Sequence, residues 1–151
     1  MTNAHTKPTI VVGYDGSSTA RAALLYAARR ARPGGHLYVV HAIDLPPDFL
    51  GSPYYSGLLT ERRARGSELL GALSRGEDSL AEVDVHTELL GGPPAEAIAA
   101  VARARNADEI AIGARGLGRV RALLGSVSHE LLHIADRPVV VIPSGAVEKI
   151  E

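Results

Sequence analysis

The chain has 151 residues, of which 46% are hydrophobic and 4% aromatic, and its formal net charge at pH 7 is −1. This length suits one domain with a sizeable core, and the nearly neutral charge argues against nucleic acid or an anionic membrane as the main partner. The chain has no cysteine for a disulfide framework, no apolar run near the roughly 18 residues of a spanning helix, and no apolar segment at its N-terminus. The protein is therefore expected in the cytoplasm.

The chain begins with a predicted strand, turn and helix. Residues 9–14 (TIVVGY) form an aliphatic run that reaches a glycine, which is typical of a strand buried on both faces. The polar residues 15–18 supply turn and N-cap chemistry. Apolar residues then recur with helical spacing over 17–31, until Pro33 and two glycines end the helix.

A second strand and a second helix are predicted on either side of a long loop. Residues 36–43 (HLYVVHAI) are predicted as the strand and 60–73 as the helix, although Gly66 and Gly71 weaken the helical pattern. Residues 45–59 hold three of the nine prolines and are expected to be irregular. A loop of this length in a compact domain is more often functional or mobile than structural.

The rest of the chain continues the alternation of strands and helices. Strands are predicted over 83–89, 109–112 and 138–142, and helices over 95–104 and 126–135. This alternation predicts an α/β fold, namely a single-domain, open, five-stranded parallel sheet with helices on both faces. In such a sheet, ligands bind beyond the carboxyl ends of the strands, where the strand order reverses.

A glycine-rich loop follows the fourth predicted strand. Residues 112–127 (IGARGLGRVRALLGSV) contain four glycines and three arginines. Glycine permits positive φ and close approach of a ligand, and successive N–H groups bind anions. A helix that begins near Ser126 would add free N–H groups and its dipole, and Arg115, Arg119 and Arg121 would add charge-assisted contacts. The loop alone fits a solvated surface turn equally well.

Three groups of residues are expected to converge at this edge of the sheet: Gly13 to Asp15, residues 41–44 and the glycine-rich loop. Asp15 is a candidate acceptor for a ribose or base, or a metal ligand through water, and its alternative role is to cap the first helix. Backbone around Ala42 is placed to meet an adenine edge, with Ile112 as an apolar wall.

Four blocks of this sequence, in this order, resemble the universal stress protein family over residues 8–143: IVVGYDGSSTARAALLYAA, VVHAID, GGPPAEAI and IGARGLGRVRALLGSVSHELLHIADRPVVVIP. The resemblance implies a Rossmann-like fold of the adenine nucleotide alpha-hydrolase-like type, flanked by tails at 1–7 and 144–151. It also implies a homodimer through the last strand, 138–142, and an ATP ligand with or without Mg²⁺.

The resemblance further implies which residues bind the nucleotide. In ATP-binding members the loop has the pattern G, two residues, G, nine residues, G, then S or T. By position, the cofactor-binding residues are Gly13, Tyr14 and Asp15 on the adenosine side, Ala42 at the adenine, and Ile112, Gly113, Arg115, Gly116, Gly125, Ser126 and Val127 around the phosphates.

This chain departs from the family pattern in one respect, because only eight residues separate Gly116 from Gly125. A deletion of one residue shifts the phosphate-binding N–H groups by up to roughly 3.8 Å, one Cα step, unless the loop relaxes. Gly118 is a candidate source of that slack. The departure therefore bears directly on whether ATP binds.

Catalytic motifs give weaker matches. The chain lacks a GxxxxGK[ST] P-loop, a cysteine nucleophile and a GxSxG elbow. The letters HELLH at 129–133 satisfy HExxH, but a surface histidine pair on a packed helix is the favoured interpretation. His41 and His86 are interpreted as strand-end residues, and no acidic pair supports a phosphorylation receiver. No catalytic residue and no metal site are predicted.

The leading hypothesis is a non-enzymatic, dimeric regulator whose bound ATP biases loops that an unknown protein partner recognises. Gly113→Val or Gly125→Val is expected to abolish nucleotide binding with the fold intact. Two alternatives stay open. One is a nucleotide-free dimeric interaction module associated with stress, and the other is a slow ATPase in which Asp15 is the only evident base.

Overall fold

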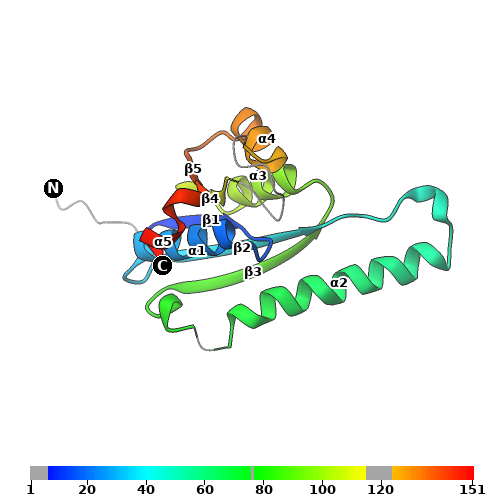
Figure 1. Cartoon of the computed structure of the whole chain (residues 1–151), viewed down its shortest axis with the longest axis horizontal. Coiled ribbons are helices and arrows are strands. Elements are labelled where there is room, and N and C mark those ends of the chain that lie inside the picture. The colour runs from blue at the N-terminus through cyan, green and yellow to red at the C-terminus, as the bar shows by residue number, and fades with distance from the viewer. Residues whose placement is uncertain (1–6, 76, 115–123) are drawn as a thin grey trace.

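Five parallel strands form the centre of the protein in a computed structural model that describes residues 7–75, 77–114 and 124–151 (Figure 1). Their order across the sheet is β3-β2-β1-β4-β5. The strands are β1 (Thr9–Gly13), β2 (His36–Ile43), β3 (Asp84–Gly91), β4 (Glu109–Gly113) and β5 (Val139–Ile142). The predicted fold class is confirmed, and the strand order reverses between β1 and β4.

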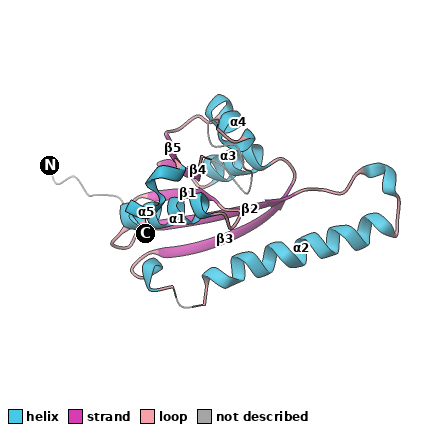
Figure 2. Ribbon diagram, in the orientation of Figure 1, coloured by secondary structure: helices cyan, strands magenta, loops and turns pink. Residues whose placement is uncertain are grey.

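Helices cover both faces of the sheet, with α3 and α4 on one side of the strands and α2 on the other (Figure 2). The helices are α1 (Ser18–Ala31), α2 (Tyr54–Leu73), α3 (Pro94–Ala104), α4 (Ser126–Ile134) and α5 (Val147–Ile150). Successive residues of β1 alternate between the two layers: Ile10 and Val12 pack with α1, and Val11 packs with α3. This double burial explains the continuous aliphatic runs in the strands.

The first helix, α1, begins directly after a serine that caps it. Ser17 is the N-cap, and its Oγ accepts a hydrogen bond from the Ala20 N–H at 3.3 Å. The buried face of α1 consists mainly of alanines. Small side chains let the helix axis approach the sheet closely, which matters for the end of β4 described below.

The second helix is longer than predicted, because it begins at Tyr54 and not near residue 60. The expected irregular segment is correspondingly shorter, and it includes a 3-10 turn at Asp48–Leu50. The three prolines of residues 45–59 led to the prediction of a loop. Pro53, however, directly precedes the first residue of α2, where its missing N–H costs little. The buried residues of α2 are Gly66, Leu70 and Leu73, so the pattern gave little indication of the first turns.

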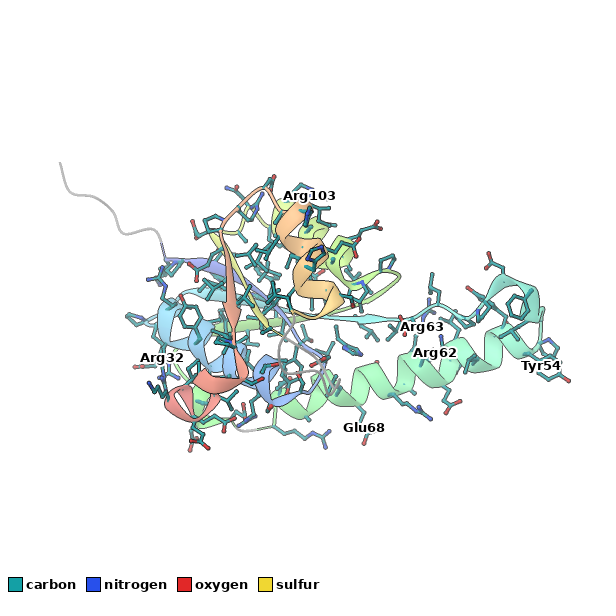
Figure 3. The ribbon with its side chains drawn as sticks, turned by 45° about the horizontal axis from the view of Figure 1, so that its top comes forward. Arg32, Tyr54, Arg62, Arg63, Glu68 and Arg103 are labelled. Atoms are coloured by element: carbon teal, nitrogen blue, oxygen red, sulfur yellow. The ribbon has the colours of Figure 1, made fainter. Side chains whose placement is uncertain are left out.

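The far end of α2 projects beyond the sheet. Figure 3 shows Tyr54 at that end and Arg62 nearer the middle of the helix. The Arg62 guanidinium donates a hydrogen bond to the Asp44 carbonyl at 2.8 Å, which joins α2 to the chain that leaves β2. Within the described residues, no helix is both long enough and apolar enough to span a bilayer.

The residues expected to form a C-terminal tail are folded onto the domain. They form a 3-10 turn at Ser144–Ala146 and the short helix α5. Val147 and Ile150 pack against the cluster that contains α1. The Arg29 guanidinium donates a hydrogen bond to the Ile150 carbonyl. Of the expected N-terminal tail, residues 1–6 lie outside the described residues.

Candidate functional site

The candidate site lies where β1 and β4 diverge at their carboxyl ends. β1 ends at Gly13 and β4 ends at Gly113. A Cβ added at Gly13 would lie 2.6 Å from Ile98 Cδ1 and 3.1 Å from Ile112 Cγ2. Ile112 is only 3% exposed, so it packs in the core beside Gly13. The structure therefore brings Gly13 and Ile112 together, as the sequence predicted.

Tyr14 takes part in this edge through its backbone. Its N–H donates to the Val40 carbonyl at 2.9 Å, and its carbonyl accepts a hydrogen bond from His41 Nδ1 at 2.8 Å. The ring itself is buried on the α1 face of the sheet. Burial raises the pKa of the Tyr14 hydroxyl, and this effect outweighs the opposite effect of the neighbouring Arg21 guanidinium. Tyr14 thus stays neutral and anchors the end of β1.

Asp15 is exposed at the turn between β1 and α1. Its Oδ1 accepts a hydrogen bond from the Ser17 N–H at 2.9 Å, while the Ser17 hydroxyl caps the helix. Asp15 therefore shapes the turn, and the N-cap is Ser17. A carboxylate has about four lone-pair sites, so the exposed Asp15 carboxyl group is able to accept further hydrogen bonds.

The peptide groups of Ala42 point past the end of β1. The Val40 carbonyl faces β1, where it accepts from the Tyr14 N–H, whereas the Ile43 carbonyl faces β3 and accepts from the Gly92 N–H at 3.0 Å. Because peptide groups alternate sides along a strand, those of Ala42 face the β1 side. β1 has already ended there at Gly13, so a planar ligand could meet both groups.

The two ends of the glycine-rich loop are fixed to each other. The Gly125 N–H donates to the Ala114 carbonyl at 2.7 Å. The Ser128 hydroxyl contacts the carbonyls of Gly113 at 2.9 Å and Ala114 at 3.2 Å, and Ser128 is only 2% exposed. Ser128 was not among the residues predicted from the sequence. Ser128 precedes Leu131 by three residues, so the two side chains share the buried face of the helix. This spacing is the sequence signal that could have identified Ser128 as buried.

The first turn of α4 presents backbone donors that have no acceptor among the described residues. The N-cap, Gly125, makes no side-chain cap hydrogen bond, and its carbonyl first accepts from the His129 N–H at 3.0 Å. The N–H groups of Ser126, Val127 and Ser128 consequently lack an acceptor inside the helix. These donors and the helix dipole favour an anion. Arg115 and Gly116, which were predicted to help, lie outside the described residues, as do Gly118, Arg119 and Arg121.

The prediction that Gly113→Val would leave the fold intact is wrong. A Cβ added at Gly113 would lie 2.3 Å from Thr19 Oγ1 and 2.8 Å from the Ala20 backbone nitrogen. Gly113 is needed because the start of α1 crosses directly over it. Positive φ is not the reason at either end of the loop: Gly113 is not among the positive-φ glycines, and Gly125 has φ −63° and ψ 160°.

The histidines of the HELLH sequence form an exposed pair on α4. The ring centroids of His129 and His133 are 4.8 Å apart, and His133 Nδ1 contacts the His129 carbonyl at 2.9 Å. In the described part of the chain, neither belongs to a group of three or more possible metal ligands. Among the described residues, the pair therefore has no third ligand of the kind that a zinc protease requires.

Comparisons with known proteins agree on one family. Residues 8–143 match the model of the universal stress protein family. The universal stress protein in the QAH/OAS sulfhydrylase 3′ region of Thermus aquaticus is 39% identical over 139 residues, which are 89% of this chain and 97% of that relative. The solved universal stress protein UspA from Lactobacillus plantarum has a TM-score of 0.73 and 24% identity, over 90% of this chain and 97% of its own. A family protein from Arabidopsis thaliana, solved with AMP bound, has a TM-score of 0.66 and 18% identity, over 93% and 94% of the two chains.

Proposed function

Because the chain belongs to the universal stress protein family, as its sequence motifs predicted, we propose that it binds an adenine nucleotide at the carboxyl ends of β1, β2 and β4. The observation that carries this proposal is the uncapped first turn of α4 beside the end of β4. The AMP-bound relative from Arabidopsis thaliana supports a ligand of this class.

The phosphates would occupy the first turn of α4. The Gly125 N–H and the Ser128 hydroxyl already bond the carbonyls at the end of β4. They therefore act as supports, and the backbone N–H groups of Ser126 and Val127 are the donors that remain to hold a phosphate. Gly113 lets α1 and β4 meet closely behind this position.

The adenosine would extend from there toward β2. The N–H and C=O of Ala42 form the donor and acceptor pair that an adenine edge requires. The exposed carboxylate of Asp15 can accept hydrogen bonds from ribose hydroxyls. Gly13 ends β1 between these two contacts, and Ile112 packs beside it as an apolar wall. The proposed ligand is ATP, with Mg²⁺ held by its phosphates.

We further propose a regulatory and not a catalytic role. Asp15 is the one carboxylate among the proposed ligands, and its contact with the Ser17 N–H holds it in the turn. The edge strand β5 has half-buried valines at 139–141, and an exposed edge of this kind can pair with a second copy of the chain. The protein would then be a cytoplasmic homodimer whose nucleotide state a protein partner recognises.

Replacing Ser126 by proline or alanine tests the phosphate position. Proline fits the first helical residue, and Gly125 already has the φ and ψ that a residue before proline prefers. Both variants remove the hydroxyl, but only Ser126→Pro removes the N–H. We expect Ser126→Pro to bind Mg·ATP about tenfold more weakly than Ser126→Ala in equilibrium dialysis. Equal affinities for the two variants, with both folded, would place the phosphates elsewhere.

A further inference from the structure

Three possible metal ligands face one another at the amino ends of β2 and β3. Asp84 Oδ2 lies 3.0 Å from His36 Nδ1 and 3.1 Å from His86 Nε2. All three ligand atoms lie within 4.8 Å of one another. Within the part of the chain that the structure describes, this is the one such group of three.

The parallel register of the sheet creates this cluster. His36 is the direct cross-strand partner of Asp84, and His86 is the partner of Tyr38. Residues two apart on a strand share a face, so all three ligand side chains lie on the same side of the sheet. Neighbouring strands are about 4.8 Å apart, which brings the cross-strand pair within reach of one ion.

The His86 ring is oriented by stacking on a neighbouring side chain. The ring stacks on Tyr38 with centroids 4.7 Å apart and an interplanar angle of 15°. The Arg105 guanidinium lies 4.8 Å from the Tyr38 centroid and is itself paired with Glu88 at 2.8 Å. A ligand held in this way loses little side-chain entropy when an ion binds.

We propose that His36, Asp84 and His86 form a binding site for a divalent transition-metal ion, for which Zn²⁺ is the reference. Two imidazole nitrogens and one carboxylate oxygen suit Zn²⁺, and solvent would complete the coordination. Zn–N and Zn–O bonds of about 2.0 Å require ligand atoms about 3.3 Å apart in a tetrahedron. The distances from Asp84 Oδ2 to the two histidine nitrogens nearly meet this requirement. A rotation of the partly exposed His36 side chain would shorten the remaining distance, which separates the two histidine nitrogens.

The site is separate from the proposed nucleotide site. His36 begins β2 and Ile43 ends it, so the amino and carboxyl ends of this strand are about 23 Å apart. The three metal ligands lie at the amino end, and the proposed nucleotide site lies at the carboxyl end. Within the described sheet, β3 is an edge strand whose one partner is β2. An ion bound by His36 and Asp84 would link β2 to β3 and so stabilise the edge strand β3.

Titration of the untagged, chelator-stripped protein with ZnCl₂ tests the proposal. We expect one Zn²⁺ per chain by calorimetry, and a melting temperature raised by about 5–10 °C at one hundred times the dissociation constant. His86→Phe keeps a ring to stack on Tyr38 and removes the ligand atom, whereas Asp84→Asn keeps the shape and removes the charge. Each variant should weaken binding at least about tenfold.

The His129→Ala/His133→Ala double variant is the matched control, because it removes the other histidine pair of the described chain. It should bind Zn²⁺ with unchanged affinity. Loss of binding in this control would overturn the proposal, as would unchanged binding in both His86→Phe and Asp84→Asn. Absence of any binding to the wild-type protein up to about 1 mM Zn²⁺ would also overturn it.

Discussion

Gly113→Ala is expected to destabilise the protein by about 3 kcal/mol. The added Cβ would lie 2.3 Å from Thr19 Oγ1, 2.7 Å from Thr19 Cβ and 2.8 Å from the Ala20 backbone nitrogen. All three atoms belong to the start of α1, and two of them, Thr19 Cβ and the Ala20 nitrogen, cannot rotate away, so the helix itself must shift. Urea unfolding followed by circular dichroism measures the loss.

Gly57→Ala is the matched control for this substitution. Gly57 lies in α2, and a Cβ added there would have no heavy atom within 4 Å apart from its chain neighbours and the backbone of its own helix, so the same methyl group meets open space. We expect a gain of about 1 kcal/mol at this position, because alanine favours the helix over glycine. Equal stability of the Gly113→Ala and wild-type proteins would contradict the close contact between α1 and β4.

Ser128→Ala is expected to cost about 2 kcal/mol and to weaken nucleotide binding as well. The hydroxyl is buried and reaches the carbonyls of Gly113 and Ala114, so its removal leaves buried acceptors without this donor. The same contacts hold the first turn of α4 beside the end of β4. Unfolding in urea and ATP affinity are both measured on one preparation.

Ser126→Ala supplies the comparison on the same helix. Ser126 lies at the surface and is less buried than Ser128, so its truncation should change the free energy of unfolding by no more than about 0.5 kcal/mol. If Ser128→Ala were as stable as Ser126→Ala, the hydroxyl would not hold α4 to β4. The proposed support of the phosphate position would then fail with it.

The sheet could be predicted from sequence because β1, β4 and β5 hold short aliphatic runs next to glycine or proline, and because β2 and β3 carry strand patterns of their own. The run at 36–43 matched the limits of β2, and Ser17 marked the start of α1. Such signals are local, since double burial and capping act within a few residues. The first turns of α2 had no comparable signal, because few of its side chains are buried.

The candidate site could be predicted only in outline. The sequence indicated that Gly13, Ala42 and Gly113 lie at the carboxyl ends of strands, and the parallel pairing of β2, β1 and β4 places these ends at one edge of the sheet. It did not indicate why Gly113 is glycine, since that depends on Thr19 in a helix nearly one hundred residues earlier. The cluster of His36, Asp84 and His86 was missed for a similar reason, because it exists only in the register of β2 with β3.

The proposed adenine nucleotide would bind at the carboxyl ends of the strands despite a loop one residue shorter than the family pattern. Calorimetric titration of nucleotide-stripped protein with Mg·ATP measures this binding. We expect saturable binding at one site per chain, which Ser126→Pro weakens relative to Ser126→Ala. No heat of binding up to millimolar ATP would contradict this proposal and would favour a nucleotide-free interaction module.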